Sequence, residues 1–231
     1  MKNNKSKFVL MIFFGCLIFS FSLANAASSP QFLTSWKAYN YTPDWYQGKS
    51  FPIYSTPVEV AFELIDNNKI ANLSKNEIRW YINDALFTKG VGLKNIRFTP
   101  TSQAGTNISV RIAVQKYNGG ELNKFIYIPS KNPEAIISSP YLTKNVVIGN
   151  NYQFKIFPFF FNVSSLNNIN FGWTVNNQTA SLGEDEVNPN ILNLNISTST
   201  PSGLTLNINA TVSNILQSIE SVTKDLKLIV Q

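Results

Sequence analysis

Apolar and polar residues alternate along most of this chain. The cleanest run covers residues 204–212, where leucine, isoleucine, alanine and valine alternate with threonine and asparagine. Other runs with this period are residues 58–64, 78–82, 108–114, 152–156, 171–175, 192–196 and 226–230. Strict alternation is typical of a β-strand that packs one face and exposes the other to water. Polar turn-forming residues separate the runs, at 83–84, 118–120 and 201–203. The pattern therefore predicts an all-β chain of short strands.

Two segments depart from this alternation. Over residues 214–222 the spacing of Ile215, Ile219 and Val222 is helical, so we expect a short helix or a covered loop there. Residues 157–161 read Phe-Pro-Phe-Phe-Phe. Consecutive apolar residues cannot all face one side of a strand, and a proline breaks the hydrogen-bonded ladder. We expect these rings to pack between domains. An outward patch for a partner is the alternative.

The two halves of the chain repeat one pattern. Residues 69–84 align without a gap on residues 162–177. Six aligned pairs agree in chemistry: Ile70 with Val163, Leu73 with Leu166, Ile78 with Phe171, Trp80 with Trp173, Ile82 with Val175, and Asn83 with Asn176. Self-similarity at a fixed spacing indicates a repeated structural unit. The sequence therefore predicts two copies of one β-domain in tandem.

A tryptophan lies at the middle of a predicted strand in each copy. In immunoglobulin-like sandwiches a buried tryptophan packs between the two sheets, and Trp80 and Trp173 suit that position. The predicted fold class is therefore all-β, with two tandem immunoglobulin-like β-sandwiches after a signal peptide. The expected divisions are a signal peptide over 1–26, domain 1 with an aromatic N-terminal arm over 27–132, and domain 2 over 133–231.

The tryptophan motifs also carry a family resemblance. Residues 78–84 (IRWYIND) and 171–177 (FGWTVNN) resemble the central strand and turn of bacterial Ig-like and PKD-like extracellular domains. The segment 35–52 further resembles exported, uncharacterised proteins of small-genome (Parcubacteria-type) bacteria. The resemblance implies a structural or adhesive role and brings no activity with it. A fold alone does not specify a ligand.

The first residues have the composition of an export signal. Three lysines precede an uncharged apolar run over residues 8–23, and Ala-Asn-Ala follows at 24–26. This order is typical of a secretory signal peptide, so we expect cleavage after Ala26. An uncleaved anchor is the alternative, because the apolar run approaches the roughly 20 residues that span a bilayer. The mature chain is expected to have no membrane span and to lie in the periplasm, outside the cell or at its surface.

Composition argues against most kinds of catalysis. The chain has no histidine, and its one cysteine, Cys16, would leave with the signal peptide. The usual general base, the thiol nucleophile and the commonest transition-metal ligands are then missing. Residues 184–186 form the one acidic cluster, for which a solvated turn is preferred over a calcium site. A glycosidase needs two facing carboxylates, and nothing in the sequence points to such a pair. We expect no enzyme, no metal and no cofactor.

Charge is distributed unevenly. Residues 27–132 carry 12 basic and 7 acidic side chains, for +5, whereas residues 133–231 carry 4 and 6, for −2. So modest a charge on an exported protein argues against nucleic-acid binding. Arg79, Arg97 and Arg111 are expected to face outward, and the strands of Arg79 and Arg111 to share a sheet. They would form a basic face or simply keep the surface soluble.

Aromatic residues concentrate before the first long strand. Residues 32–54 contain Phe32, Trp36, Tyr39, Tyr41, Trp45, Tyr46, Phe51 and Tyr54. Exposed tryptophan and tyrosine rings stack on sugars or anchor interfaces, whereas an arm packed on domain 1 would bury them. The candidate binding residues are Trp36, Tyr41, Trp45, Tyr46, Phe159 and Phe160.

The sequence predicts a non-enzymatic, exported cell-envelope protein that acts as an adhesion or assembly module. Its expected partner is an envelope protein or a glycan. The alternative is a carbohydrate-binding module that uses aromatics near Trp36 and Trp45. Exposure of those rings would favour the alternative, and their burial would exclude it.

Overall fold

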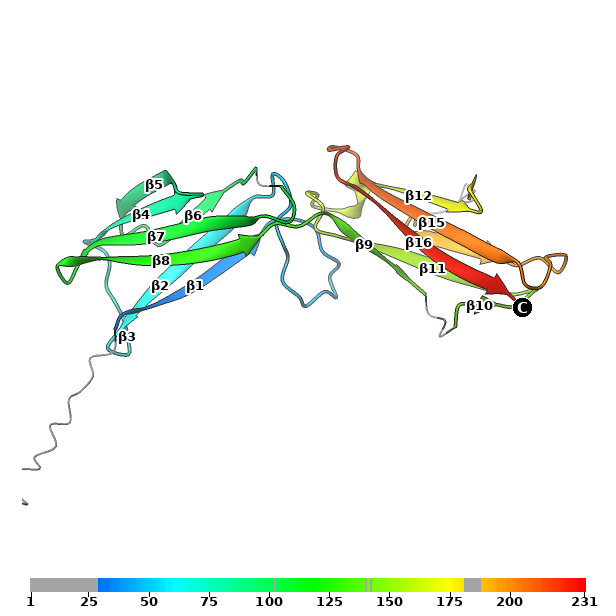
Figure 1. The fold of residues 1–231 in the computed structure, drawn as a ribbon, viewed down its shortest axis with the longest axis horizontal. Coiled ribbons are helices and arrows are strands. Elements are labelled where there is room, and N and C mark those ends of the chain that lie inside the picture. The colour runs from blue at the N-terminus through cyan, green and yellow to red at the C-terminus, as the bar shows by residue number, and fades with distance from the viewer. Residues whose placement is uncertain (1–28, 102, 140, 142, 181–187) are drawn as a thin grey trace, which may run out of the picture.

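The computed structural model describes residues 29–101, 103–139, 141, 143–180 and 188–231. Within these residues the chain forms sixteen β-strands and one short 3-10 helix, arranged as two sandwiches end to end (Figure 1). The predicted signal peptide (1–26) and the acidic cluster at 184–186 lie outside the described residues. No helix in the described part of the chain is long and apolar enough to cross a membrane.

The first sandwich consists of two antiparallel sheets. In one sheet β2 (Val58–Asp66) pairs with β1 (Gln31–Ala38), β3 (Lys69–Ile70) and β6 (Asn95–Phe98). The other sheet has the order β5-β4-β7-β8, with strands Ala85–Val91, Glu77–Ile82, Asn107–Tyr117 and Gly120–Pro129. The alternation predicted for β2 is confirmed, because Val58, Val60, Phe62 and Leu64 are all buried.

The second sandwich also has two sheets. One has the order β14-β11-β9, with strands Ile191–Asn195, Asn151–Phe159 and Glu134–Ser138. The other has the order β10-β16-β15-β12-β13, with strands Asn145–Val146, Ser221–Val230, Thr205–Asn214, Ile169–Val175 and Gln178–Thr179. A 3-10 turn at Leu166–Asn168 leads into β12. The core of this second sandwich includes Phe154, Ile156, Ile208 and Val212.

The aligned positions of the two copies have the same environments. Trp80 and Trp173 are 0 % and 2 % exposed, which confirms their predicted burial. Each indole N–H donates to a loop carbonyl, of Leu93 at 2.9 Å and of Pro189 at 3.1 Å. A buried indole N–H needs such an acceptor, so each loop completes the packing of its own tryptophan.

The aligned asparagines also match. Asn83 and Asn176 both have a left-handed backbone, with φ of 46° and 49°, and both begin the tight turn after the tryptophan strand. Their side-chain oxygens accept the backbone N–H of Ser109 at 3.0 Å and of Asn207 at 2.9 Å. Asparagine tolerates a left-handed φ better than most residues, and its side chain here also bonds to the neighbouring strand of the sheet, β7 in the first sandwich and β15 in the second.

The expected helix or covered loop over residues 214–222 is wrong. Strand β15 continues to Asn214, and β16 begins at Ser221. The backbone N–H of Asn214 donates to the carbonyl of Glu220 at 2.9 Å and closes a hairpin, which leaves too few residues for a helix. The apolar side chains of the turn face solvent: Ile215, Leu216 and Ile219 are 62 %, 70 % and 80 % exposed.

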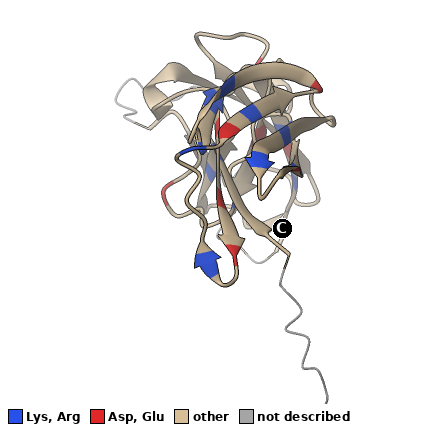
Figure 2. Ribbon diagram, turned by 90° about the vertical axis from the view of Figure 1, so that its left-hand side faces the viewer, with Lys and Arg blue, Asp and Glu red and all other residues tan. Residues whose placement is uncertain are grey.

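The arginines lie in the predicted places but do not make a purely basic face. Arg79 on β4 and Arg111 on β7 share a sheet, as expected, whereas Arg97 lies on β6 in the opposite sheet. Arg79 forms an ion pair with Glu77 at 2.6 Å. Seen from its free end, the first sandwich carries basic and acidic residues side by side (Figure 2). Mixed charge of this kind suits solubility better than anion binding.

Candidate functional site at the joint between the sandwiches

The connection from β1 to β2, residues 39–57, extends from the first sandwich to the end of the second (Figure 1). Tyr41 forms an antiparallel bridge with Phe161. The N–H of Tyr41 donates to the carbonyl of Phe161 at 2.8 Å, and the N–H of Phe160 donates to the carbonyl of Tyr41 at 2.7 Å. Backbone hydrogen bonds of the kind that join strands therefore join the two sandwiches.

Aromatic rings fill the joint beside this bridge. Ile53, Phe159 and Phe160 form a small buried core, against which Tyr46, Phe51 and Phe157 pack. The rings of Phe51 and Phe160 meet edge to face at 5.7 Å, and those of Tyr46 and Phe159 at 5.3 Å. Such pairs stabilise by about 0.5–1.5 kcal/mol beyond the area they bury. The expectation that residues 157–161 pack between domains is confirmed for Phe157, Phe159 and Phe160, whereas Phe161 lies in the core of the second sandwich.

Phe160 has an unusual backbone. Its φ is 67°, in the left-handed region that a bulky residue occupies only at a cost of about 1–2 kcal/mol. The residue is held there because its N–H bonds to Tyr41 and its ring is buried in the joint. Its carbonyl in turn accepts the Asn40 side-chain amide at 3.1 Å. The joint thus fixes Phe160 from several directions at once.

A buried polar network adjoins the aromatic core. Thr56, which is fully buried, donates from Oγ1 to Asn162 Oδ1 at 2.7 Å. Asn162 Nδ2 donates to Tyr54 O at 2.9 Å and to Glu220 Oε1 at 2.7 Å. The buried Glu220 carboxylate also accepts the Asn162 backbone N–H and the Asn214 amide, each at 2.9 Å. A buried carboxylate is costly unless it is hydrogen-bonded in this way. The bonds to Glu220 lie within the second sandwich and hold Asn162, whose side chain bonds across the joint to Thr56 and Tyr54.

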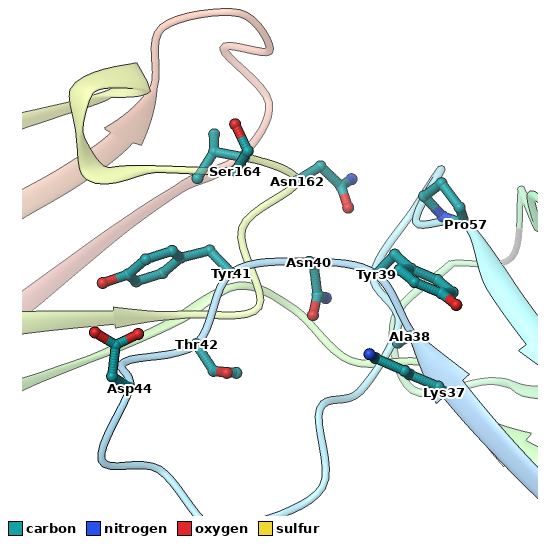
Figure 3. Close-up of a pocket in the computed structure, with 11 residues that line it drawn as sticks. Lys37, Ala38, Tyr39, Asn40, Tyr41, Thr42, Asp44, Pro57, Asn162 and Ser164 are labelled. Carbon is teal, nitrogen blue, oxygen red and sulfur yellow. The ribbon is translucent and has the colours of Figure 1, made fainter.

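An open cavity of about 580 Å³ lies on one side of the joint (Figure 3). Residues from both sandwiches line it: Lys37, Ala38, Tyr39, Asn40, Tyr41, Thr42, Asp44, Pro57, Asn162, Val163 and Ser164. The walls offer phenol, hydroxyl and amide groups with one cation and one carboxylate. This set donates and accepts hydrogen bonds, as the polar groups of binding sites do.

The two tyrosines of the cavity keep their protons at neutral pH. Burial raises the pKa of Tyr41, and the negative charge of Asp44 raises it further. The hydrogen bond that Tyr39 donates to Glu59 raises the pKa of Tyr39, with smaller contributions from burial and the Glu59 charge. A raised pKa makes a phenol a hydrogen-bond donor rather than a nucleophile. Among the described residues, no three His, Cys, Asp or Glu side chains gather as a metal site would require.

The structure brings the six candidate binding residues to this joint and exposes them unequally. Trp45 is 58 % exposed and touches Phe157 and Phe159 edge-on at 5.2 and 5.9 Å. Trp36 is half-buried against Phe51, and the ammonium of Lys49 covers its ring at 3.8 Å. Tyr41 and Tyr46 are half-buried, and Phe159 and Phe160 are 4 % exposed. Among these six, Trp45 offers the most open ring, and their role in binding stays a prediction.

Sequence reasoning did not single out the polar residues of the joint. Thr56, Asn162 and Glu220 lie far apart along the chain, and no spacing rule connects them. One weak signal was present: Glu220 interrupts residues 205–222, which otherwise contain no charged side chain. An isolated carboxylate in an uncharged stretch indicates that the side chain has specific hydrogen-bond donors around it. Those donors can be named only once the fold is known.

Comparison with known proteins gives likeness of fold alone. No protein-family model matches the sequence. No curated protein matches it either. Among solved structures, the fibronectin(III)-like modules of Clostridium thermocellum CbhA are 10 % identical, with 86 % of this chain and 94 % of that chain covered and a TM-score of 0.30.

Two further solved structures are similar at the same level. The N-terminal Ig1-2 module of the Drosophila receptor protein tyrosine phosphatase DLAR is 10 % identical over 87 % of this chain and 98 % of that chain, with a TM-score of 0.29. SGBP-B from the mixed-linkage glucan utilization locus of Bacteroides ovatus, solved with a heptasaccharide, is 14 % identical over 88 % and 47 %, with a TM-score of 0.27. The fold is all-β and immunoglobulin-like. The sheet order and the paired tryptophans of this chain carry that conclusion.

Proposed function

We propose that this protein is an exported, non-enzymatic module of the cell envelope, in which two domains (27–132 and 133–231) form one rigid arm for adhesion or assembly. Its partner is an envelope protein or a glycan. The joint carries this proposal, because its backbone bridge, its aromatic core and the hydrogen bonds of Asn162 with Thr56 and Tyr54 all favour one orientation. Preorganised binding surfaces lose less entropy on association than flexible ones.

The chemistry of the joint supports binding rather than turnover. The chain has no histidine, and the raised pKa values of Tyr39 and Tyr41 keep both phenols protonated. Glu220, which is buried, accepts three hydrogen bonds from Asn162 and Asn214. A carboxylate committed in this way is a structural anchor. These groups are suited to binding a polar ligand through hydrogen bonds rather than to converting it chemically.

A second candidate function has one specific observation in its favour. The open ring of Trp45, beside the half-buried Phe157, is a platform of the kind that stacks on a sugar. Trp36 does not contribute to such a platform, because Lys49 covers its ring. A carbohydrate-binding module would therefore use Trp45 with the hydroxyl and amide groups of the adjoining segment.

One experiment separates the two candidates. The mature chain from residue 27 serves as bait for solubilised envelope of the native host, beside Trp45→Ala and the control Tyr127→Ala, which removes another exposed ring (62 % exposed) that is not part of the aromatic core of the joint. A protein partner retained by all three baits supports the assembly module. Glycan-rich material that only Trp45→Ala loses establishes the sugar-binding module instead. Failure of all three baits to retain a partner contradicts both.

A further inference from the structure

Four carboxamide side chains form a ladder on the outer face of the second sandwich. Strands β11 and β14 pair so that Asn151 lies opposite Asn195 and Gln153 lies opposite Asn193. Asn195 Nδ2 donates to Asn151 Oδ1 at 2.6 Å, and Gln153 Nε2 donates to Asn193 Oδ1 at 3.0 Å. All four residues are exposed. The ladder is therefore an ordered, solvent-facing row of hydrogen-bond donors and acceptors.

A cavity of about 410 Å³ opens over this ladder. All four amides line it, and Tyr141, Tyr152 and Leu194 supply the remaining walls. The Tyr141 ring is held in place, because it meets the Tyr152 ring edge to face at 4.8 Å and its hydroxyl accepts the backbone N–H of Gln153 at 3.2 Å. The ring is still 36 % exposed. The cavity thus combines one fixed aromatic ring with a row of amide groups.

The walls of this cavity, as far as the structure describes them, contain no charged side chain. The nearest charged residue along β11 is Lys155, whose ammonium lies 5.1 Å from the centre of the Phe157 ring. Because Phe157 follows Lys155 in the strand whereas Gln153 precedes it, this contact directs the cation away from the ladder. A charged ligand would therefore find no opposite charge in the cavity, and a neutral ligand would need none.

The corresponding strands of the first sandwich carry charges instead. Strand β2 pairs with β6 as β11 pairs with β14, and on its outer face Glu59 lies opposite Arg97. On the same sheet Glu63 forms an ion pair with Lys94. Charged side chains are the usual covering of a face that only needs to be soluble. The uncharged amide row is therefore a particular feature of the second sandwich, beyond what the shared fold requires.

We infer that this cavity binds a neutral, hydroxyl-rich glycan. A carboxamide offers an acceptor oxygen and two donor hydrogens in one plane, which matches a pair of neighbouring sugar hydroxyls. Among the described residues, Asn195 Oδ1, Asn151 Nδ2 and Gln153 Oε1 bond to no protein atom, so they remain for a ligand. The partly open Tyr141 ring supplies an apolar surface on which the C–H face of a sugar stacks.

Other occupants fit these walls less well. A protein partner commonly places an aromatic or arginine anchor in a desolvated pocket, which would leave the amides without hydrogen bonds. A nucleic acid needs cations for its phosphates, and the cavity has none among its described walls. The site goes beyond the proposed function and does not rest on it. Gln153 is separated from Phe159 of the joint by about 20 Å along β11, at roughly 3.3 Å per residue.

Binding of the purified protein to an array of soluble oligosaccharides tests the site. The neutral probes consist of glucose, mannose, galactose, xylose or N-acetylglucosamine units, and the acidic probes contain uronate or sulfate groups. We expect binding to neutral probes in preference to acidic ones. Gln153→Ala and Asn195→Ala should each weaken this binding by about tenfold, because each removes hydrogen bonds to the ligand and one bond of the ladder.

Asn207→Ala is the matched control. It removes an exposed amide from β15, in the opposite sheet of the same sandwich, so glycan binding should be unchanged. Thermal unfolding of the three variants should match that of the unchanged protein, because all three substituted side chains are exposed. A loss of binding in the two ladder variants then reports on the site rather than on the fold.

Three results would overturn the inference. The first is that no neutral probe binds, and the second is that acidic probes bind more tightly. The third is a neutral glycan that binds both ladder variants as tightly as the unchanged protein; if Trp45→Ala abolished that binding, the sugar would lie at the joint instead. Capture of an envelope protein through the joint does not involve the ladder, so failure of this site and failure of the proposed function are distinguishable.

Discussion

The two sandwiches have similar cores and different outer surfaces. Each buries one tryptophan whose indole N–H reaches a loop carbonyl. On the outer face of the first, the guanidinium of Arg111 lies over the Tyr81 ring at 3.6 Å. On the outer face of the second, the hydroxyls of Thr211 and Thr223 hydrogen-bond across the strands at 3.1 Å. The repeat thus preserves the packing that specifies the fold, while the surfaces have diverged, so the fold cannot reveal the partner.

The largest expected effect comes from removing the shared core residue. Trp80→Ala and Trp173→Ala should each lower the free energy of unfolding by about 3–5 kcal/mol, because each leaves a large cavity and an unpaired loop carbonyl. Denaturant unfolding followed by circular dichroism measures both. Trp45→Ala, which truncates an exposed ring, should cost less than about 1 kcal/mol.

If Trp80→Ala and Trp173→Ala lowered the free energy of unfolding by clearly different amounts, the two cores would not be equivalent. If one tryptophan could be removed at little cost, the two positions would be equivalent in place but not in energy. Loss of structure confined to the mutated sandwich would show that each core is held independently. Loss of both together would show that the joint couples them.

The equivalence of the two interiors was accessible from the sequence, and so was the aromatic stretch 157–161 of the joint, but the polar network of the joint was not. Trp80 and Trp173 stand in strands whose alternation is local, and Asn83 and Asn176 follow them directly, so pattern alone places all four. Glu220 meets its partner Asn162 from 58 positions along the chain, and Thr56 meets Asn162 from 106. The first contact depends on how the second sandwich closes, and the second depends on how the two sandwiches dock; no local periodicity encodes either.

Exposure was the other quantity that the sequence could not supply. Trp36 and Trp45 belong to the same aromatic segment, yet Lys49 covers the first and the second remains open. The spacing of Ile215 and Ile219 imitates a helix although it arises in a hairpin turn. In both cases the burial of a side chain depends on neighbours outside its own segment.

A smaller effect is expected from weakening the joint itself. Asn162→Ala removes the acceptor of Thr56, the donor to Tyr54 O and one of the three hydrogen bonds to Glu220, while the backbone N–H of residue 162 stays. Leaving a buried carboxylate and a buried hydroxyl short of partners should cost about 2–3 kcal/mol in the free energy of unfolding. Asn170→Ala, an exposed change on β12, is the control and should cost less than about 0.5 kcal/mol.

The Asn162→Ala variant also tests whether the stability of each sandwich depends on the joint. Amide hydrogen exchange should rise in residues 39–57 and 157–163, which form the joint, while the strands around Trp80 and Trp173 stay protected. Faster exchange throughout both sandwiches would instead mean that neither folds stably without the joint. Unchanged exchange in the joint would contradict the role assigned to Asn162.

The smallest expected effect is a loss of stability at alkaline pH through Tyr41. Burial, with the charge of Asp44, raises the pKa of Tyr41 above the ordinary tyrosine value of about 10 that it takes in the unfolded chain. Its contribution to stability is therefore complete below about pH 10 and is lost as the pH rises through the folded pKa, because ionisation favours the unfolded state. Chemical unfolding from about pH 8 to about pH 11 should show a shallower decline for Tyr41→Phe than for the unchanged protein. The remaining decline would include Tyr39 and Tyr117, whose pKa values are raised chiefly by hydrogen bonds to Glu59 and Asp66. Parallel curves for the two proteins would mean that Tyr41 is as well solvated in the joint as in the unfolded chain.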